Sequence, residues 1–88
     1  MNLQFRKSFE KDLGKIRDDA LLQRIKAVIE EVENAENLSE VSNIKKLISN
    51  DDYYRIRLGD YRIGITIFNG VIVFVRALPR KDIYRYFP

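Results

Sequence analysis

The hydrophobic pattern of the chain changes its period near the middle, and this change restricts the fold more than any other feature. Between residues 9 and 32 apolar residues recur every three or four positions, which is the spacing of amphipathic helices. From residue 53 onward apolar and polar residues alternate, which is typical of half-buried strands. Helices followed by a run of strands indicate the α+β class.

The first half predicts a short strand over residues 3–5 and then two helices. Ser8 is expected to cap the first helix, and Asp18 or Asp19 the second. The apolar stripe of the second helix closely follows the helical period: Leu21, Leu22, Ile25, Val28, Ile29 and Val32. A weaker helical pattern covers residues 38–48.

Three strands are predicted in the second half, over residues 53–58, 61–68 and 71–78. Gly59-Asp60 separates the first two, and Asn69-Gly70 is a strong hairpin signal because both positions of a type I′ turn require positive φ. Pro79 ends the third strand, since proline cannot donate to a ladder. The pattern leaves the conformation of residues 80–88 open.

The length of 88 residues suits one small domain, so residues 1–88 are expected to form a single unit. We expect an α+β fold in which a small antiparallel sheet, made of the N-terminal strand and the C-terminal β-meander, packs on two N-terminal helices. No segment approaches the roughly 18 apolar residues that span a bilayer. Because the N-terminus also lacks a signal-peptide pattern, we expect a cytoplasmic protein without a membrane partner.

The absence of cysteine and histidine excludes a thiolate zinc site, a cysteine nucleophile and a histidine base. No metal or cofactor is therefore expected. The net charge is +3; residues 1–50 hold nine basic and nine acidic residues, so the excess lies in residues 51–88. Six of the seven basic residues there are arginines, which suit bidentate phosphate contacts. A polyanionic partner is predicted, with an ordinary solvated surface as the alternative.

The alternation places Arg55 and Arg57 on one face of their strand. If Gly59-Asp60 is a two-residue loop, Arg57 pairs with Arg62, and Arg55 pairs with Gly64. Like charges that face each other across a ladder cost a few tenths to roughly 1 kcal/mol. A purely structural face does not need this arrangement, so it favours a phosphate-binding site.

Gly64 is expected to leave room on this face for a ligand to approach the backbone. The neighbouring strand is expected to add an apolar strip to the same face: Val73, Val75 and Ala77. A strip of this kind is covered either by a partner or by the C-terminal tail.

Three segments of the chain resemble the RelE/ParE superfamily of bacterial toxin–antitoxin toxins. They are Ile44-Lys45-Lys46-Leu47, Tyr54-Arg55-Ile56-Arg57-Leu58-Gly59-Asp60-Tyr61-Arg62-Ile63 and Arg80-Lys81-Asp82-Ile83-Tyr84. The likeness spans nearly the whole chain and implies a metal-independent endoribonuclease of the RelE type, which enters the ribosomal A site and cuts the mRNA codon there. It also implies a RelB-like cognate antitoxin from the same operon, and contact with operator DNA only through that antitoxin.

The resemblance implies a catalytic set of Arg57, Arg62, Arg80 and Tyr84. In this set Arg62 matches the arginine that grips the scissile phosphate, and Tyr84 matches a tyrosine that stacks on a codon base. The implied nucleic-acid-binding set is Arg55, Lys45, Lys46 and Lys81.

Two positions depart from the family pattern. Pro79 stands where many relatives have histidine, and Arg57 stands where a lysine has been assigned as the base. Because a guanidinium is a poor proton acceptor, the general base is left as Lys81, Tyr84 or water. Two other functions stay open, a ParE-like DNA gyrase poison and a non-catalytic basic binding module.

Overall fold

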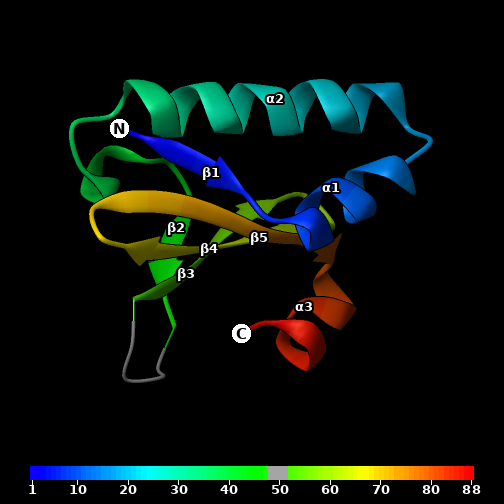
Figure 1. Cartoon of the computed structure of the whole chain (residues 1–88). Coiled ribbons are helices and arrows are strands. Elements are labelled where there is room, and N and C mark those ends of the chain that lie inside the picture. The colour runs from blue at the N-terminus through cyan, green and yellow to red at the C-terminus, as the bar shows by residue number, and fades with distance from the viewer. Residues whose placement is uncertain (48–51) are drawn as a thin grey trace.

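The computed structural model of the chain describes residues 1–47 and 52–88, and its centre is a five-stranded sheet (Figure 1). The elements, in chain order, are β1 (Leu3–Phe5), α1 (Lys7–Gly14), α2 (Asp19–Asn34), the 3-10 helix η1 (Leu38–Glu40), β2 (Ile44–Lys46), β3 (Tyr53–Leu58), β4 (Tyr61–Phe68), β5 (Val71–Pro79) and α3 (Arg80–Tyr86). The predicted α+β class is confirmed, and the undecided tail forms helix α3.

The sheet has the strand order β1-β5-β4-β3-β2 and is mixed. The strands β2, β3, β4 and β5 pair antiparallel, but β1 pairs parallel with β5. The expectation of a purely antiparallel sheet was therefore wrong at one edge. Consecutive strands joined by tight turns must run antiparallel, whereas β1 joins its partner only after the rest of the chain and no hairpin sets its direction.

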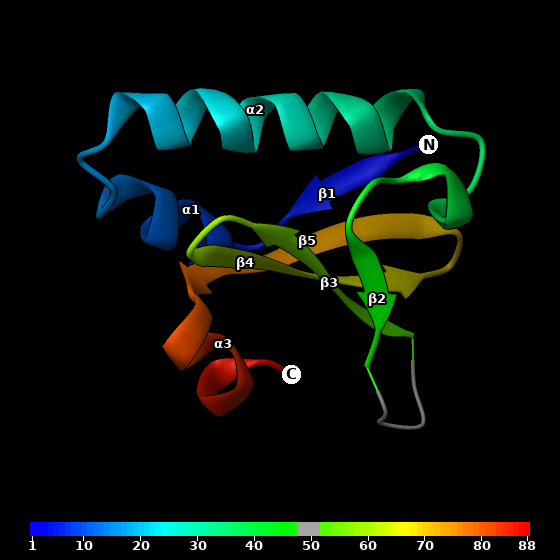
Figure 2. The same ribbon diagram turned by 180° about the vertical axis from the view of Figure 1, so that it is seen from behind.

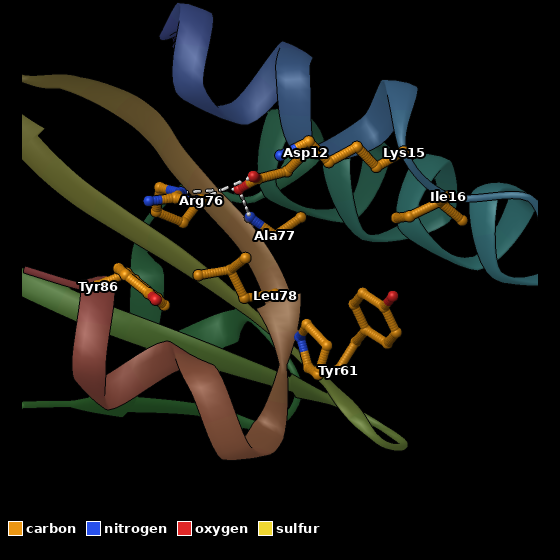
Figure 3. A pocket seen from close by; sticks show the side chains of 9 residues that line it. Asp12, Lys15, Ile16, Tyr61, Arg76, Ala77, Leu78 and Tyr86 are labelled. Carbon is orange, nitrogen blue, oxygen red and sulfur yellow. Dashed lines mark hydrogen bonds and ion pairs between the residues drawn. The ribbon is translucent and has the colours of Figure 1, made fainter.

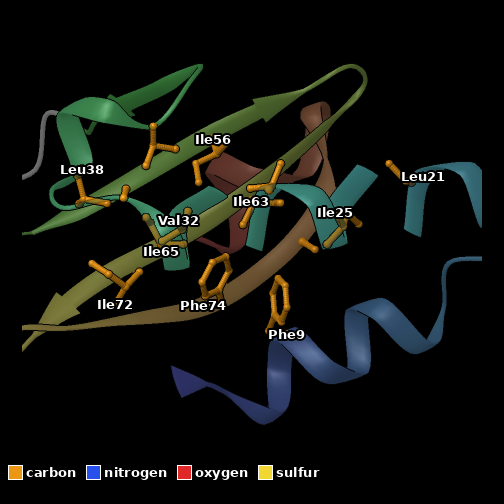
Figure 4. Close-up of a cluster of buried hydrophobic side chains, with 14 residues drawn as sticks. Phe9, Leu21, Ile25, Val32, Leu38, Ile56, Ile63, Ile65, Ile72 and Phe74 are labelled. Carbon is orange, nitrogen blue, oxygen red and sulfur yellow. The ribbon is translucent and has the colours of Figure 1, made fainter. Parts of the chain in front are cut away.

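The two faces of the sheet have different covers. Helices α1 and α2 lie on one face and α3 lies on the other (Figures 1 and 2). The apolar stripe of α2 packs against the inner side chains of the sheet, and Figure 4 shows this core: Phe9, Leu21, Ile25, Val32, Ile56, Ile63, Ile65, Ile72 and Phe74. Each such side chain contributes about 1.5–3 kcal/mol when fully buried. Among the described residues, no helix is long and apolar enough to cross a membrane.

The helix starts confirm one expectation and correct another. Asp18 caps α2, since its Oδ1 accepts a hydrogen bond of 3.1 Å from the Leu21 N–H. Ser8 was wrongly expected to cap α1, which already begins at Lys7. The helix starts early because β1 ends at Phe5 and the chain turns at once, and Ser8 instead donates to the Val75 carbonyl at 2.6 Å.

The helix predicted over residues 38–48 is not formed, and position 48 lies outside the described residues. The segment forms η1 and then β2. Asn43 has a φ of 63°, which breaks a helix and turns the chain onto the edge of β3, where Ile44 pairs with Ile56. Leu38 and Val41 are nevertheless buried, so the apolar spacing correctly predicted that these residues are buried but not which conformation they adopt.

The predicted register of the β3–β4 hairpin is confirmed. Leu58 pairs with Tyr61 across the Gly59-Asp60 loop, and Arg57 therefore stands directly opposite Arg62. The second hairpin is also as expected, since Asn69 and Gly70 both have positive φ, at 51° and 76°.

A β-bulge changes one face assignment on β5. Gly64 pairs with Arg76, but the next residue of β4, Ile65, pairs with Phe74, so Val75 is an extra residue on β5. Val73 lies on the arginine-bearing face as expected, because it pairs with Thr66. Ala77 was wrongly placed on that face, since the bulge shifts the alternation and puts it in the core.

Side chains of α1 close the edge of β5 beyond the end of β1. The Asp12 carboxylate accepts from Arg76 Nε at 2.8 Å, from Arg76 Nη2 at 3.0 Å and from the Ala77 N–H at 2.9 Å (Figure 3). One turn earlier, Ser8 binds the Val75 carbonyl. The helix therefore satisfies backbone groups that a further strand would otherwise bind.

Replacing Asp12 with alanine should lower the free energy of unfolding by about 3 kcal/mol, because the Arg76 charge and the Ala77 N–H lose a buried partner. Glu10→Ala is the matched control, since Glu10 is an exposed acid on the same helix and should change stability by less than about 0.5 kcal/mol. Urea unfolding followed by circular dichroism measures both. Equal stability of the two variants would contradict the role given to Asp12.

Candidate nucleic-acid interface

Basic side chains gather on the face of the sheet that lies away from α2. Arg57 on β3 stands opposite Arg62 on β4, and Lys45 on β2 stands opposite Arg55 on β3. Two neighbouring ladders thus each hold a pair of like charges, an arrangement that is unfavourable unless an anion binds between them.

Arg62 is the most enclosed of these side chains, with 7% of its surface exposed. Its Nη1 donates to the Gly59 carbonyl at 2.6 Å and to the Tyr61 carbonyl at 2.8 Å. These bonds hold the guanidinium against the β3–β4 turn. Its position is therefore fixed before any ligand arrives.

The charges around Arg62 show which residues lie near it. Burial lowers the pKa of Arg62, and the positive charges of Arg55, Arg80 and Arg57 lower this pKa further, while Tyr84 acts in the opposite direction. Arg62 nevertheless stays protonated at neutral pH, as arginine does in proteins. Arg55, Arg57, Arg80 and Tyr84 thus lie close enough to Arg62 to influence its charge.

Among the described residues, no acidic side chain forms an ion pair with this cluster. Arg57 is exposed, and Arg55 donates from Nη1 to the Asn43 carbonyl at 3.2 Å, while its buried Nε has no hydrogen-bond partner among the described residues. Within residues 1–47 and 52–88, a single ion pair is found, between Arg76 and Asp12. The arginines of the cluster therefore keep their full charge and several free donors for a phosphate.

Helix α3 brings Arg80 and Tyr84 to this face. The Arg80 N–H donates to the Asp60 carbonyl at 2.7 Å, which attaches the start of the helix to the β3–β4 turn. Ile83 is fully buried, whereas Tyr84 is 62% exposed. Arg80 and Tyr84 are four residues apart and share one side of the helix.

The predicted binding residues are only partly assembled. Lys45 shares the face of Arg55, but Lys46 pairs with Tyr54 and so points to the other face of the edge strand. Lys81 is exposed and lines a shallow hollow with Arg80, Asp60 and Pro79.

Gly64 does not leave the expected room for a ligand. The ring of Phe87 fills the space above it, since a Cβ on Gly64 would lie 2.7 Å from two ring carbons. Phe87 is 2% exposed and contacts the Tyr53 ring edge-on, at 5.6 Å between ring centroids. A partner and the C-terminal tail were the two expected covers of this face, and the structure shows the tail there.

A second hollow lies between α1, β5 and α3 and has a volume of about 470 Å³ (Figure 3). Tyr86 and Arg76 flank it, with the guanidinium carbon 5.7 Å from the ring centroid. Tyr86 lies about 200° around α3 from Tyr84, so the helix separates this hollow from the arginine cluster. None of the eight predicted site residues lines it. In the described part of the chain, no three acidic side chains gather as metal ligands do.

Comparisons with known proteins identify the family of the chain. Residues 3–84 match the family model described as ParE toxin of type II toxin-antitoxin system, parDE. The chain is 45% identical to Toxin RelE3 of Methanocaldococcus jannaschii over the full length of both proteins. This relative is archaeal, so it does not support the bacterial origin that the resemblance implied.

Two solved structures are similar over most of the chain. The RelB-RelE antitoxin-toxin complex from Methanococcus jannaschii matches with a TM-score of 0.81 and 45% identity, covering 97% of this chain and 99% of that one. The archaeal RelE-RelB complex from Pyrococcus horikoshii OT3 matches with a TM-score of 0.73 and 28% identity, covering 90% and 93%.

Replacing Arg57 with threonine should raise the free energy of unfolding by about 0.5–1 kcal/mol, because it removes a like-charge pair and adds a β-branched residue. The gain should shrink at high salt, which screens exposed charges. Lys46→Thr is the matched control, because Lys46 faces Tyr54 and should show no salt-dependent gain. Urea unfolding at low and high ionic strength compares the two. If Arg57→Thr instead had a lower free energy of unfolding, the facing arginines would not destabilise the sheet by repulsion.

Proposed function

Because the chain belongs to the RelE/ParE family of toxin–antitoxin toxins, we propose that it is a ribosome-dependent endoribonuclease that cleaves mRNA in the A site and so inhibits translation. The observation that carries this proposal is the facing of Arg57 and Arg62 across the β3–β4 ladder, on the same face as Arg55 and next to the helix that carries Arg80 and an exposed tyrosine. Such a cluster suits a phosphate with a neighbouring base.

The chemistry we propose needs no nucleophile from the protein. The ribose 2′-oxygen attacks the adjacent phosphorus and the bond from phosphorus to the 5′-oxygen breaks, which gives a 2′,3′-cyclic phosphate, and the leaving 5′-oxygen takes up a proton from water. Negative charge grows on the phosphate oxygens in the transition state. Arg57, Arg62 and Arg80 stabilise that charge, as donors do in an oxyanion hole.

Tyr84 is proposed to hold one base of the codon out of its stack. The exposed ring lies on the same side of α3 as Arg80, and base–aromatic stacking contributes roughly 1–3 kcal/mol. In-line placement of the 2′-oxygen contributes much of the remaining acceleration. The proton of the 2′-hydroxyl passes to Lys81, Tyr84 or water, because the guanidiniums are poor acceptors.

We further propose a RelB-like antitoxin from the same operon as the cognate partner, with operator DNA bound only through it. Support comes from the two similar solved structures, which are complexes of RelE proteins with RelB. The ribosome and its mRNA are the proposed target.

A ParE-like gyrase poison is the second candidate, because the matching family model is a ParE model. The gyrase-poison branch typically lacks the full basic and tyrosine set that Arg57, Arg62, Arg80 and Tyr84 form here. RNA cleavage is therefore favoured, and a non-catalytic basic module is the third outcome to test.

Brief induction of the protein should produce new mRNA 5′ ends inside translated codons, and these ends should be absent from untranslated regions. Sequencing of RNA 5′ ends before and after induction measures this. DNA breaks with intact mRNA would instead indicate gyrase poisoning, and the absence of both would indicate a binding module. Purified protein should cut naked RNA far more slowly than ribosome-bound RNA, and equal rates would contradict ribosome dependence.

Arg62→Ala should reduce single-turnover cleavage on programmed ribosomes by about 10²- to 10³-fold, because one donor to the developing charge is lost. Arg17→Ala is the matched control, since Arg17 is exposed and lies in the loop between α1 and α2. Circular dichroism of both variants should show a folded chain. A fully active Arg62→Ala variant would refute the assigned role.

A further inference from the structure

We propose that Gly64 and Phe87 are positioning residues, whose mutual contact sets the orientation of α3 and so places Arg80 and Tyr84 over the arginines of the sheet. This inference rests on the proposed nuclease function for its catalytic consequence. The contact itself is tested separately below.

Helix α3 cannot hold its own orientation. It has seven residues, whereas isolated helices shorter than about 12–15 residues are marginal in water. Its position therefore depends on its attachments to the rest of the chain. They include the backbone bond from the Arg80 N–H to the Asp60 carbonyl, the buried side chains of Ile83 and Phe87, and the Tyr86 ring beside Arg76.

The Phe87 ring needs a glycine at position 64. Three ring carbons would lie 2.7, 2.7 and 2.8 Å from a Cβ at that position, closer than Cβ atoms approach other groups. The backbone does not demand the glycine, because Gly64 is not among the glycines with positive φ. A glycine inside a central strand weakens the sheet. The close approach of Phe87 is the feature of the fold that explains its presence.

The contact also fixes the rotation of α3 about its axis. Ile83 within α3 and Phe87 directly after its last residue are both buried, and the Phe87 ring packs on Gly64, so together they hold one side of the helix against the sheet. The Phe87 N–H donates to the Ile83 carbonyl at 2.8 Å, which keeps the ring in line with that side. Tyr84 lies about 100° farther around the helix. Where Phe87 packs therefore determines which way Tyr84 projects.

Gly64 links this contact directly to the proposed catalytic strand. It lies two residues from Arg62 on the same face of β4, a separation of about 7 Å. Arg55 stands opposite Gly64 across the ladder. The ring of Phe87 thus rests on the strand position that lies opposite Arg55 and two residues from Arg62, and a shift of the ring moves α3 relative to both strands.

The test uses Gly64→Ala, Phe87→Ala and the double variant. The first variant inserts the clashing Cβ, the second removes the ring, and in the double variant the Cβ meets no ring. Gly14→Ala is the matched glycine control, because a Cβ there meets nothing within 4 Å. Phe68→Ala is the matched aromatic control, since Phe68 is 66% exposed and lies at the end of β4, where it belongs to neither α3 nor the arginine cluster.

Two readouts are measured for every variant. Amide hydrogen exchange at Phe87 and Arg80 reports the attachment of α3 without any reference to activity, and the amides of β4 and β5 report the fold. Single-turnover cleavage on programmed ribosomes gives the maximal rate and the half-saturating ribosome concentration separately.

Gly64→Ala and Phe87→Ala should each lose protection at Phe87 while β4 and β5 stay protected. Each should lower the maximal rate by about 10- to 100-fold, as misplacement of a catalytic group does, with half-saturation within about twofold of the original. The double variant should be no worse than Phe87→Ala alone, because the two changes act on one contact. Phe87→Leu should restore part of the rate.

Three results would overturn the proposal. They are unchanged exchange in Gly64→Ala, losses that add up in the double variant, and lost protection at Phe87 without any fall in the maximal rate. If the original protein does not cleave at all, the proposed function fails and the catalytic consequence fails with it. The exchange data then still decide whether the contact holds α3.

Discussion

Like charges face each other on one side of β3 and β4, and the packing of the other elements has to offset their repulsion. Arg57 and Arg62 face each other across the ladder, and Lys45 and Arg55 repeat the pattern one strand away. Such pairs weaken a sheet, so the stability must come from elsewhere. It comes from the opposite face, where α2 and the inner residues of β4 and β5 form the core. An anion bound between the arginines would return stability to the folded state, which couples the site to its ligand.

The arginine on β5 and the arginines of the cluster have different surroundings. On the side of β5, α1 side chains replace a missing strand, and Asp12 neutralises Arg76, which lies outside the cluster. The arginines of the cluster receive no such partner within the described residues. The chain thus pairs the arginine that supports the fold and leaves charged those that face the proposed ligand. The short helix α3 carries the remaining residues of the proposed site, and its side chains Ile83 and, just after it, Phe87 are buried.

Strictly local rules predicted the part of the site that lies within one hairpin. A side-chain period of two and a two-residue loop determine the register, so the facing of Arg57 and Arg62 follows from spacing alone. Features that depend on the whole fold could not be found in this way. The bulge at Val75 leaves no mark in the alternation and moved Ala77 to the core, and the apolar spacing of residues 38–48 fits a helix as well as an irregular segment. Gly64 stands out in the sequence, but Phe87 lies in a tail without a clear hydrophobic period. The alternation therefore predicts space for a ligand above Gly64, where the structure has the Phe87 ring.

We propose that three guanidiniums of one chain converge on the phosphate that is cut. A structure of the protein on a ribosome whose A-site codon carries a 2′-deoxyribose at the cleavage position tests it most directly, because that codon binds but cannot react. We predict that the phosphate after this sugar lies about 3 Å from donor nitrogens of Arg57, Arg62 and Arg80, with a codon base on the Tyr84 ring. A codon phosphate bound away from this face, with the arginines contacting only solvent, would contradict the claim.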